Sequence, residues 1–246
     1  MSAAVQTVAC IKWGTLFPAD YVNRLYRGVM RHVARPTRFI CFTDDARGLE
    51  DGVDARAIPD IRLPEKGMRL GPWRKLALWS KDIGVEGDIL FLDLDVVVTG
   101  ALDAFFDHKA GEFVVIKNWT TGDGVGNTSV FRYRAGSAPH LVPDFEKNPI
   151  PMSFDYDNEQ IYVSRASGLT MNFWPAEWCV SFKNQLQPRF PMNLVKMATL
   201  PADARIVVFT GNPRPHEAAA GVWPAKWYKK HYKSLKPVTW LAEHWR

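Results

Sequence analysis

The sequence predicts an α/β fold organised as one large domain, and three observations support this. The chain has 246 residues, which is enough for a single sizeable core. Its first elements run in the order strand, helix, strand, which predicts a parallel pair joined by a right-handed crossover. Residues 89–92 (ILFL) form an apolar run that is too short for a helix and is typical of a strand buried on both faces.

The N-terminal part supplies the first three elements. Residues 5–13 (VQTVACIKW) are predicted to form a strand. Apolar residues then recur at spacings of one and three from Tyr21 to Val33, which predicts a helix with Asp20 as its N-cap. Residues 38–43 (RFICFT) are predicted to form the second strand.

Polar residues follow both of these strands at their carboxyl ends. Parallel sheets bind ligands beyond the carboxyl ends of their strands. We therefore expect a binding crevice near Lys12, Trp13, Asp44 and Asp45. Simple solvation of the loops is the alternative.

Residues 47–70 are polar, with a short candidate edge strand at 57–58. Pro72 can begin a helix whose inner face carries Trp73, Leu76 and Ala77. Lys75 on this helix could neutralise phosphates near a metal, or it could belong to a solvated basic face.

Two carboxylates, Asp93 and Asp95, follow the apolar strand 89–92 directly. In an extended backbone, residues i and i+2 point to the same side, roughly 7 Å apart. Two such carboxylates repel each other, and a hard cation with a ligand's phosphates removes that cost. The pair therefore predicts a divalent-cation site, with solvated acids at a turn as the alternative.

Further along, a short helix is predicted at 102–106, a strand at 112–117, a glycine-rich loop at 122–126 and a strand at 127–133. The last strand opens with three polar residues suited to hydrogen bonding with hydroxyl groups: Asn127, Thr128 and Ser129. Residues 155–165 are predicted to form a helix that begins with a dense polar cluster: Asp155, Asp157, Asn158, Glu159 and Gln160.

A buried strand at 206–209 runs into a loop that carries Arg214 and His216. Arg binds phosphate through two parallel hydrogen bonds, and His is a common ligand of transition metals. This loop is therefore a second candidate contributor to the site, and two surface residues are the alternative.

The distribution of charge and the cysteine content indicate which partners and which cellular compartment the protein has. Of the net charge of +5, the whole excess lies in residues 222–246, where Lys residues alternate with Trp and Tyr. That segment is expected to pack on the domain or to meet an anionic membrane surface, and no nucleic-acid partner is expected. The three cysteines, Cys10, Cys41 and Cys179, are expected to be buried free thiols. We see no signal peptide or spanning segment, so we expect a cytoplasmic protein, either free or peripheral on the inner face of the membrane.

Together these motifs resemble the GT-A glycosyltransferases over roughly residues 5–216. The closest likeness is to the family 8 retaining enzymes, which include glycogenin and bacterial lipooligosaccharide galactosyltransferases. The resemblance implies a single GT-A domain over 1–221, Rossmann-like, with a mostly parallel mixed sheet and flanking helices. It also implies a hexosyltransferase that uses Mn²⁺ (or Mg²⁺) and a nucleotide sugar, often UDP-linked, with retention of configuration. The acceptor, whether saccharide, lipid-linked or protein, is left open.

The resemblance also implies roles for individual residues. Asp95 would hold the metal, and Asp93 would contact both metal and ribose. Residues at the acidic helix start would lie near the reacting sugar and acceptor: Asp157, Asn158 and Glu159 as catalytic residues, Gln160 with Asn127, Thr128 and Ser129 on the acceptor. The donor would meet Lys12, Trp13, Asp44, Lys75, Asp93 and Arg214.

The late family motif is only partly present. Val208 stands where the family has a metal-binding His, Arg214 replaces a Lys, and His216 replaces a Trp. His216 or water would then be the third metal ligand. Two other functions remain open, namely a haloacid-dehalogenase-like phosphohydrolase and a non-catalytic nucleotide-binding protein.

Overall fold

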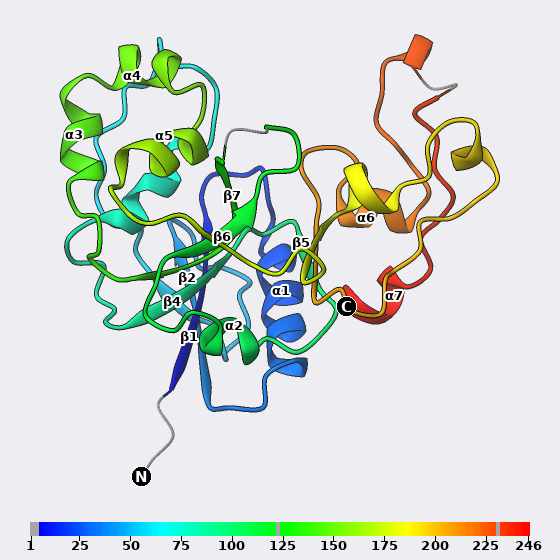
Figure 1. Ribbon diagram of the computed structural model, residues 1–246, viewed down its shortest axis with the longest axis horizontal. Helices are drawn as coiled ribbons and strands as arrows, with labels where there is room; N and C mark the ends of the chain where they lie inside the picture. Colours follow the sequence, from blue (N-terminus) through cyan, green and yellow to red (C-terminus); the bar gives the residue numbers. More distant parts are fainter. Residues whose placement is uncertain (1–4, 122–123, 230–231) are drawn as a thin grey trace.

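A seven-stranded sheet forms the centre of the computed structural model, which describes residues 5–121, 124–229 and 232–246 (Figure 1). The strand order is β3-β2-β1-β4-β7-β6-β8. Only β7 runs antiparallel to its neighbours, β4 and β6, and the other pairs in the sheet are parallel. The predicted α/β class with a mostly parallel mixed sheet is confirmed. The strands are β1 (Gln6–Lys12), β2 (Thr37–Thr43), β3 (Asp54–Arg56), β4 (Asp88–Leu92), β6 (Val114–Lys117), β7 (Gly126–Arg134) and β8 (Asn172–Phe173).

A second, three-stranded sheet has the order β5-β10-β9. Its strands are β5 (Val96–Val98), β9 (Cys179–Ser181) and β10 (Ile206–Val208). The central strand β10 pairs antiparallel with β5 and parallel with β9. Only the three residues 93–95 separate β4 from β5, so the turn that holds both aspartates connects the two sheets.

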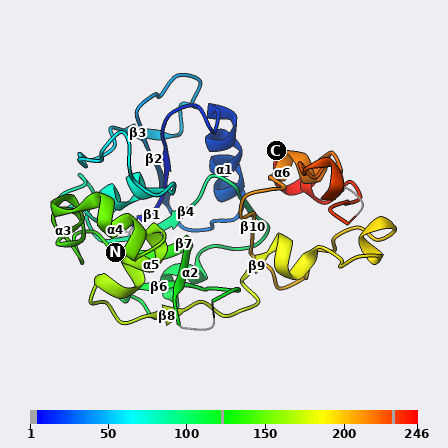
Figure 2. The same cartoon turned by 90° about the horizontal axis from the view of Figure 1, so that it is seen from above.

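Helices cover both faces of the large sheet (Figure 1, Figure 2). The α-helices are α1 (Ala19–Arg31), α2 (Ala104–Asp107), α3 (Leu141–Lys147), α4 (Pro149–Asp155), α5 (Glu159–Ala166), α6 (Pro215–Ala219) and α7 (Leu241–His244). The shorter turns are the 3-10 helices η1 (Trp73–Trp79), η3 (Met192–Leu194) and η4 (Trp227–Lys229), and the π-helical turn η2 (Phe182–Leu186).

The core consists of two layers separated by the large sheet. Along β1, the side chains of Val8 and Cys10 enter one layer and those of Ala9 and Ile11 enter the other, because successive residues of a strand point to opposite faces. The first layer contains α1, the small sheet and the C-terminal segment; the second contains η1, α3 and α5. Burial on both faces explains why the strands are apolar without alternation.

Most predicted elements are found within a few residues of their predicted positions. The helix predicted to begin after Asp20 begins earlier, with Pro18 at the N-cap position; Asp20 lies in the first turn and pairs with Arg24 at 2.6 Å. The edge strand predicted at 57–58 lies at β3 instead, where its backbone pairs with that of β2. The helix predicted at Pro72 is the 3-10 helix η1. The sequence did not predict the helices α3, α4, α6 and α7 or the strands β5, β8 and β9.

Other sequence-based expectations concern loops, thiols and the C-terminus. Residues 122–123 of the predicted glycine loop lie outside the described residues. All three cysteines are buried and free, as predicted. Among the described residues, no helix has the length and apolarity needed to cross a bilayer. Ala218, Leu235 and Trp245 share one core layer across the predicted boundary at 221, which stays a prediction.

Candidate functional site

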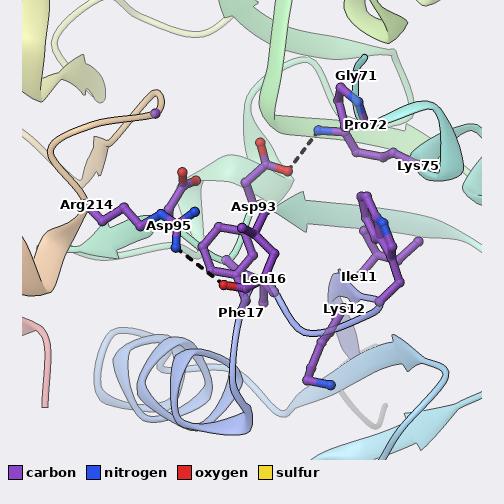
Figure 3. A pocket seen from close by; sticks show the side chains of 13 residues that line it. Ile11, Lys12, Leu16, Phe17, Gly71, Pro72, Lys75, Asp93, Asp95 and Arg214 are labelled. Atoms are coloured by element: carbon purple, nitrogen blue, oxygen red, sulfur yellow. Dashed lines mark hydrogen bonds and ion pairs between the residues drawn. The ribbon is translucent and has the colours of Figure 1, made fainter. Parts of the chain in front are cut away.

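A cavity of about 440 Å³ opens at the carboxyl ends of β1 and β4. Figure 3 shows its walls, which come from segments far apart in the sequence. Ligand sites in sheets of this kind form at this edge. The lining residues are Ile11, Lys12, Trp13, Leu16, Phe17, Gly71, Pro72, Lys75, Asp93, Leu94, Asp95, Gly211 and Arg214.

The backbone anchors the turn that carries Asp93 and Asp95 at both ends. The amide of Asp93 donates to the carbonyl of Ser129 at 2.8 Å, and the amide of Phe209 donates to the carbonyl of Asp95 at 3.3 Å. Both aspartates line the cavity and are partly exposed. The turn therefore presents two carboxylates to the cavity from a fixed backbone.

Lys75 from η1 is buried beside this turn. Its Nζ donates to Asp93 Oδ1 at 2.8 Å and to the carbonyl of Thr128 at 2.9 Å, and it lies 5.0 Å from the centre of the Phe91 ring. Burial opposes the charge on Lys75, but the carboxylates of Asp93 and Glu159 outweigh it and raise the pKa of Lys75. Lys75 is thus a charged partner of Asp93 and not part of a solvated face.

Glu159 lies behind Lys75, with only 1% of its surface exposed. Its Oε2 accepts a hydrogen bond from Thr128 Oγ1 at 2.7 Å and lies 4.0 Å from Lys75 Nζ. Its Oε1 has no hydrogen-bond partner among the residues that the structure describes. Burial raises the pKa of Glu159, while Lys75 and the Thr128 hydroxyl oppose this shift. Glu159 is therefore a second carboxyl group beside the Lys75 ammonium, more distant than Asp93.

Asp95 differs from Asp93 in that, among the described residues, its carboxyl forms no ion pair within 4.0 Å. Burial raises the pKa of Asp95 to about 8, the charge of Asp93 adds to this, and Lys75 and Arg214 act in the opposite direction. Two carboxyl groups whose joint ionisation is opposed by burial and by their mutual repulsion have the oxygen donors that a hard divalent cation prefers, and such a cation would favour the ionised form of both. Two carboxylates leave most coordination positions to water or to phosphate oxygens of a ligand. Asp93 and Asp95 therefore fit Mn²⁺ or Mg²⁺.

Arg214, in the loop after β10, borders the cavity on the side away from Lys75 (Figure 3). Its Nη1 donates to the carbonyl of Leu16 at 3.4 Å, and its guanidinium lies 4.8 Å from the centre of the Phe17 ring. These contacts leave most of its donors available. Arg214 can therefore offer hydrogen bonds to an anionic ligand in the cavity.

The predicted donor residues on the first two strands divide into two groups. Lys12 and Trp13 line the cavity, and Lys12 Nζ also contacts the carbonyl of Asp45 at 3.4 Å. Asp44 does not line it; its carboxylate accepts from the amide of Gly14 at 3.0 Å. Asp44 thus shapes the loop that carries the cavity wall.

His216 lies in α6 and is not among the lining residues. Its Nδ1 is 2.5 Å from Tyr21 Oη, and its ring stacks on Trp245. No group of three or more His, Cys, Asp or Glu side chains in the described part of the chain is arranged to hold a metal. His216 does not line the cavity that Asp93 and Asp95 line, so its coordination of a metal stays a prediction.

The other predicted catalytic residues lie outside the cavity. Asp157 adopts a φ of 62° and pairs with Arg69 at 2.5 Å, and Asn158 caps α5 by accepting from the amide of Ile161 at 3.1 Å. The backbone carbonyl of Gln160 accepts from Ser164. Only Glu159 of this cluster reaches the site, and it does so through Lys75.

The predicted acceptor residues on β7 are all buried. Asn127 Oδ1 accepts from the amide of Ser129 at 3.0 Å, and Thr128 bonds to Glu159. These side chains support the site from within the sheet. Their predicted contact with an acceptor stays a prediction.

Sequence reasoning missed two parts of the surface near this edge. Leu16 and Phe17 form a wall of the cavity, and the signal for them was their position directly after the first strand. A second hollow of about 180 Å³ combines aromatic rings with amides, including Asn118, Trp119 and Trp174. Asn118 and Trp119 directly follow β6, at the same edge of the sheet as Asp93.

Comparisons with known proteins found solved structures with a similar architecture. No family model and no curated protein sequence matches the chain. The galactosyltransferase LgtC, in a complex with donor and acceptor sugar analogs, is similar with a TM-score of 0.57 and 13% identity over 85% of this chain and 89% of that one. The glycosyltransferase GlyE of Streptococcus pneumoniae TIGR4 gives a TM-score of 0.55 and 15% identity over 85% of this chain and 56% of that one.

The bifunctional glycosyltransferase WbbM is also similar, with a TM-score of 0.56 and 10% identity over 87% of this chain and 47% of that one. Identities this low speak to architecture only. The chain nevertheless covers almost all of LgtC and about half of the other two proteins. The chain therefore has the fold of the GT-A glycosyltransferases.

Proposed function

We propose that this protein is a glycosyltransferase that moves a sugar from a nucleotide-sugar donor, most simply a UDP-sugar, to a saccharide acceptor. The observation that carries the proposal is the pair Asp93 and Asp95, placed with Lys75 and Arg214 around one cavity at the carboxyl ends of β1 and β4. Transfer with retention of configuration is taken over from the likeness to family 8.

The binding of the donor follows from the chemistry of the cavity walls. Asp93 and Asp95 would hold Mn²⁺ or Mg²⁺ together with oxygens of the donor diphosphate. Arg214 would donate hydrogen bonds to the same diphosphate from the other side. Trp13 and Phe17 offer aromatic surface for the base or the ribose.

In the reaction, the bond between the anomeric carbon and the diphosphate oxygen breaks and a bond to an acceptor hydroxyl oxygen forms. The diphosphate leaves with the electron pair of the broken bond, and its oxygen takes up the proton that the acceptor hydroxyl loses. The metal, when bound, supplies charge neutralisation for the leaving diphosphate. Arg214 adds positive charge at the place where negative charge develops.

Lys75 and Glu159 are proposed as positioning residues. Lys75 bonds to Asp93 Oδ1 and would fix the orientation of that carboxylate, leaving its other oxygen for the metal. Glu159 would in turn hold Lys75. The acceptor would approach along the edge that also carries Trp119 and Trp174, since aromatic rings and amides suit a sugar. Direct catalytic roles for Asp157 and Asn158 would require them to move toward the cavity.

A thermal-shift screen of nucleotide sugars with and without Mn²⁺ tests the proposal. A ligand present at about 100 times its dissociation constant stabilises the native state by about 2.7 kcal/mol. This corresponds to a rise in melting temperature of roughly 5–10 °C for a chain of this size. We expect a UDP-sugar to give this rise only with the metal, and slow release of UDP on longer incubation.

Other results of these experiments would support a different function or refute the proposal. Binding of a nucleotide sugar with metal but no transfer or hydrolysis would indicate a non-catalytic binder. Hydrolysis of a generic phosphate ester would indicate a phosphohydrolase, an alternative that no feature of the fold favours. No response to any nucleotide sugar would refute the proposal.

A further inference from the structure

Three aromatic side chains from distant parts of the chain meet beside the cavity. They are Tyr21 in α1, His216 in α6 and Trp245, which directly follows α7, and we call them the aromatic joint. Tyr21 is 4% exposed and Trp245 9% exposed, whereas His216 lies at the surface. The Trp245 ring stands edge-on to Tyr21 at 5.3 Å and stacks with His216 at 6.3 Å, and Tyr21 Oη lies 2.5 Å from His216 Nδ1. The aromatic joint therefore connects α1, α6 and the residues after α7.

Two arginines of α1 fix the position of Trp245. Arg24 Nη1 donates to the carbonyl of Trp245 at 2.7 Å, and its guanidinium lies 4.4 Å from the centre of the Trp245 ring. Arg31 Nη2 donates to the carbonyl of His244 at 2.8 Å. Hydrogen bonds from a charged donor are stronger than neutral ones. The end of α7 is therefore bonded in a defined place on α1 in addition to being packed there.

Both partners of Trp245 in the aromatic joint lead directly to the cavity. The Tyr21 ring lies 4.9 Å from the ring of Phe17, which lines the cavity. His216 comes two residues after Arg214, which stands at the N-cap position of α6. The Arg214 guanidinium lies 4.8 Å from the centre of the Phe17 ring. The same two cavity walls are thus connected at two points, by the aromatic joint and by the contact between Arg214 and Phe17.

The loop before α6 does not fix Arg214 by itself. Residues 209–213 separate Arg214 from the end of β10, and Gly211 among them has a φ of 73°. The hydrogen bonds of β10 to β5 hold only the start of this loop. The place of Arg214 relative to Asp95 therefore depends on where α6 docks, and the aromatic joint docks the first turn of α6 on α1.

We propose that Trp245 is a positioning residue of the nucleotide-sugar site, which acts through Tyr21 and His216 to set the distance between Arg214 and Asp95. The inference rests on the proposed function, in which Arg214 binds the donor diphosphate. Without the indole ring, α6 and Arg214 lose their fixed place, and ligand binding has to order them. The turn that carries Asp95 keeps its position, because it is tied to β4 and β5.

Calorimetry with UDP and Mn²⁺ on single and double variants tests the proposal. Trp245→Leu should weaken the binding of UDP by about 5- to 10-fold. Tyr21→Phe, which removes only the hydroxyl beside His216, should weaken it by about fivefold or less. Adding Trp245→Leu to Arg214→Ala should cause a further loss of no more than about twofold, since a positioning residue acts only through the residue that it positions. Losses of affinity that add in full would overturn the proposal.

Trp240→Leu is the matched control, because it makes the same change in the same segment. Trp240 is partly buried, and its Nε1 donates to the carbonyl of Ala198 at 3.0 Å. This variant should keep an affinity for UDP within about twofold of that of the wild type. Melting curves should show that every variant is folded. Equal weakening by Trp240→Leu and Trp245→Leu would indicate a general loss of packing and would overturn the proposal.

Hydrogen exchange of the ligand-free protein separates this inference from the proposed function. The amides of Ala218, Ala220 and Val222 are hydrogen-bonded in α6 and directly after it. They should exchange about tenfold faster in Trp245→Leu but not in Trp240→Leu, with the amides of β4 unchanged in both. Unchanged exchange in α6 would refute the positioning role even if UDP binds. Faster exchange, together with a wild type that binds no nucleotide, would refute the proposed function and support the hold of the aromatic joint on α6.

Discussion

Replacing Asp95 with Asn should stabilise the protein in the absence of metal while removing its metal-dependent ligand binding. Burial raises the pKa of Asp95 from its ordinary value of 3.8 to about 8. At pH 7 the folded protein therefore retains a proton that the unfolded chain has lost, and this difference lowers stability. Asn keeps the shape of the side chain without its charge.

The size of the effect follows from the pKa difference. Each pKa unit corresponds to about 1.4 kcal/mol, which sets an upper limit of about 4 kcal/mol at pH 7. Asp95 partly faces the water of the cavity, and solvent reduces the cost of its charge. We therefore expect Asp95→Asn to raise the free energy of unfolding by about 1–3 kcal/mol, or the melting temperature by roughly 3–10 °C.

The effect should depend on pH in a defined direction. Below pH 3.8 the carboxyl is protonated in both states, so it costs nothing. As the pH rises from there, wild-type stability falls relative to the variant, and the loss is complete above a pH of about 8. The stability difference between the two proteins should accordingly grow between those limits.

Urea denaturation in chelator-treated buffer at several pH values measures this difference. Calorimetry with UDP and Mn²⁺ then measures ligand binding, which the wild type should show and Asp95→Asn should lack. Asp51→Asn, at an exposed position, is the control and should change stability by less than about 0.5 kcal/mol. A variant that is less stable than the wild type at pH 8 and still binds UDP with Mn²⁺ would refute the reasoning.

Three further predictions concern the same site. Lys75→Met should lower the free energy of unfolding by about 3–5 kcal/mol, because Asp93 and Glu159 would lose their buried cation. Adding Glu159→Gln should recover part of the lost stability. Urea denaturation measures the stability of both variants, and a Lys75→Met protein as stable as the wild type would contradict the prediction. Arg214→Ala should weaken donor binding by about 10- to 100-fold in calorimetry, with Arg214→Lys in between and stability preserved; unchanged affinity would exclude the contact. The affinity for Mn²⁺ in the presence of UDP should rise by about tenfold per pH unit up to a pH of about 8, because metal binding displaces the Asp95 proton. An affinity that calorimetry finds to be independent of pH would contradict this prediction.

Most strands of the large sheet, and the first parallel pair, could be predicted from the sequence because their signals are local, whereas the order of the strands in the sheet was not predicted. The apolar run of β4 and the helical spacing of α1 depend only on neighbouring residues, and the crossover rule then gives the parallel pair of β1 and β2. The position of Asp93 and Asp95 at the sheet edge follows from the end of β4. The edge strand β3 was misplaced because backbone pairing to β2, and not its own composition, determines where it lies.

The arrangement around the aspartates could not be predicted, because it depends on contacts between distant residues. Glu159 and its neighbour Asp157 look alike in the sequence, yet one points into the core toward Lys75 and the other pairs with Arg69 at the surface. The left-handed φ of Asp157 and the burial of Glu159 have no local signature. His216 appeared to belong to the cavity loop, but Tyr21, 195 residues earlier, holds it elsewhere.

The short turn between β4 and β5 also limits how far the cavity can change its width. Three residues of extended chain reach only about 10 Å. One wall carries Lys75 and rests on β4, while Arg214 follows β10, which is hydrogen-bonded to β5. The two walls therefore remain tethered at the aspartates, and any opening of the cavity to admit or release a ligand has to come from the loops at its rim, such as the one carrying Leu16 and Phe17.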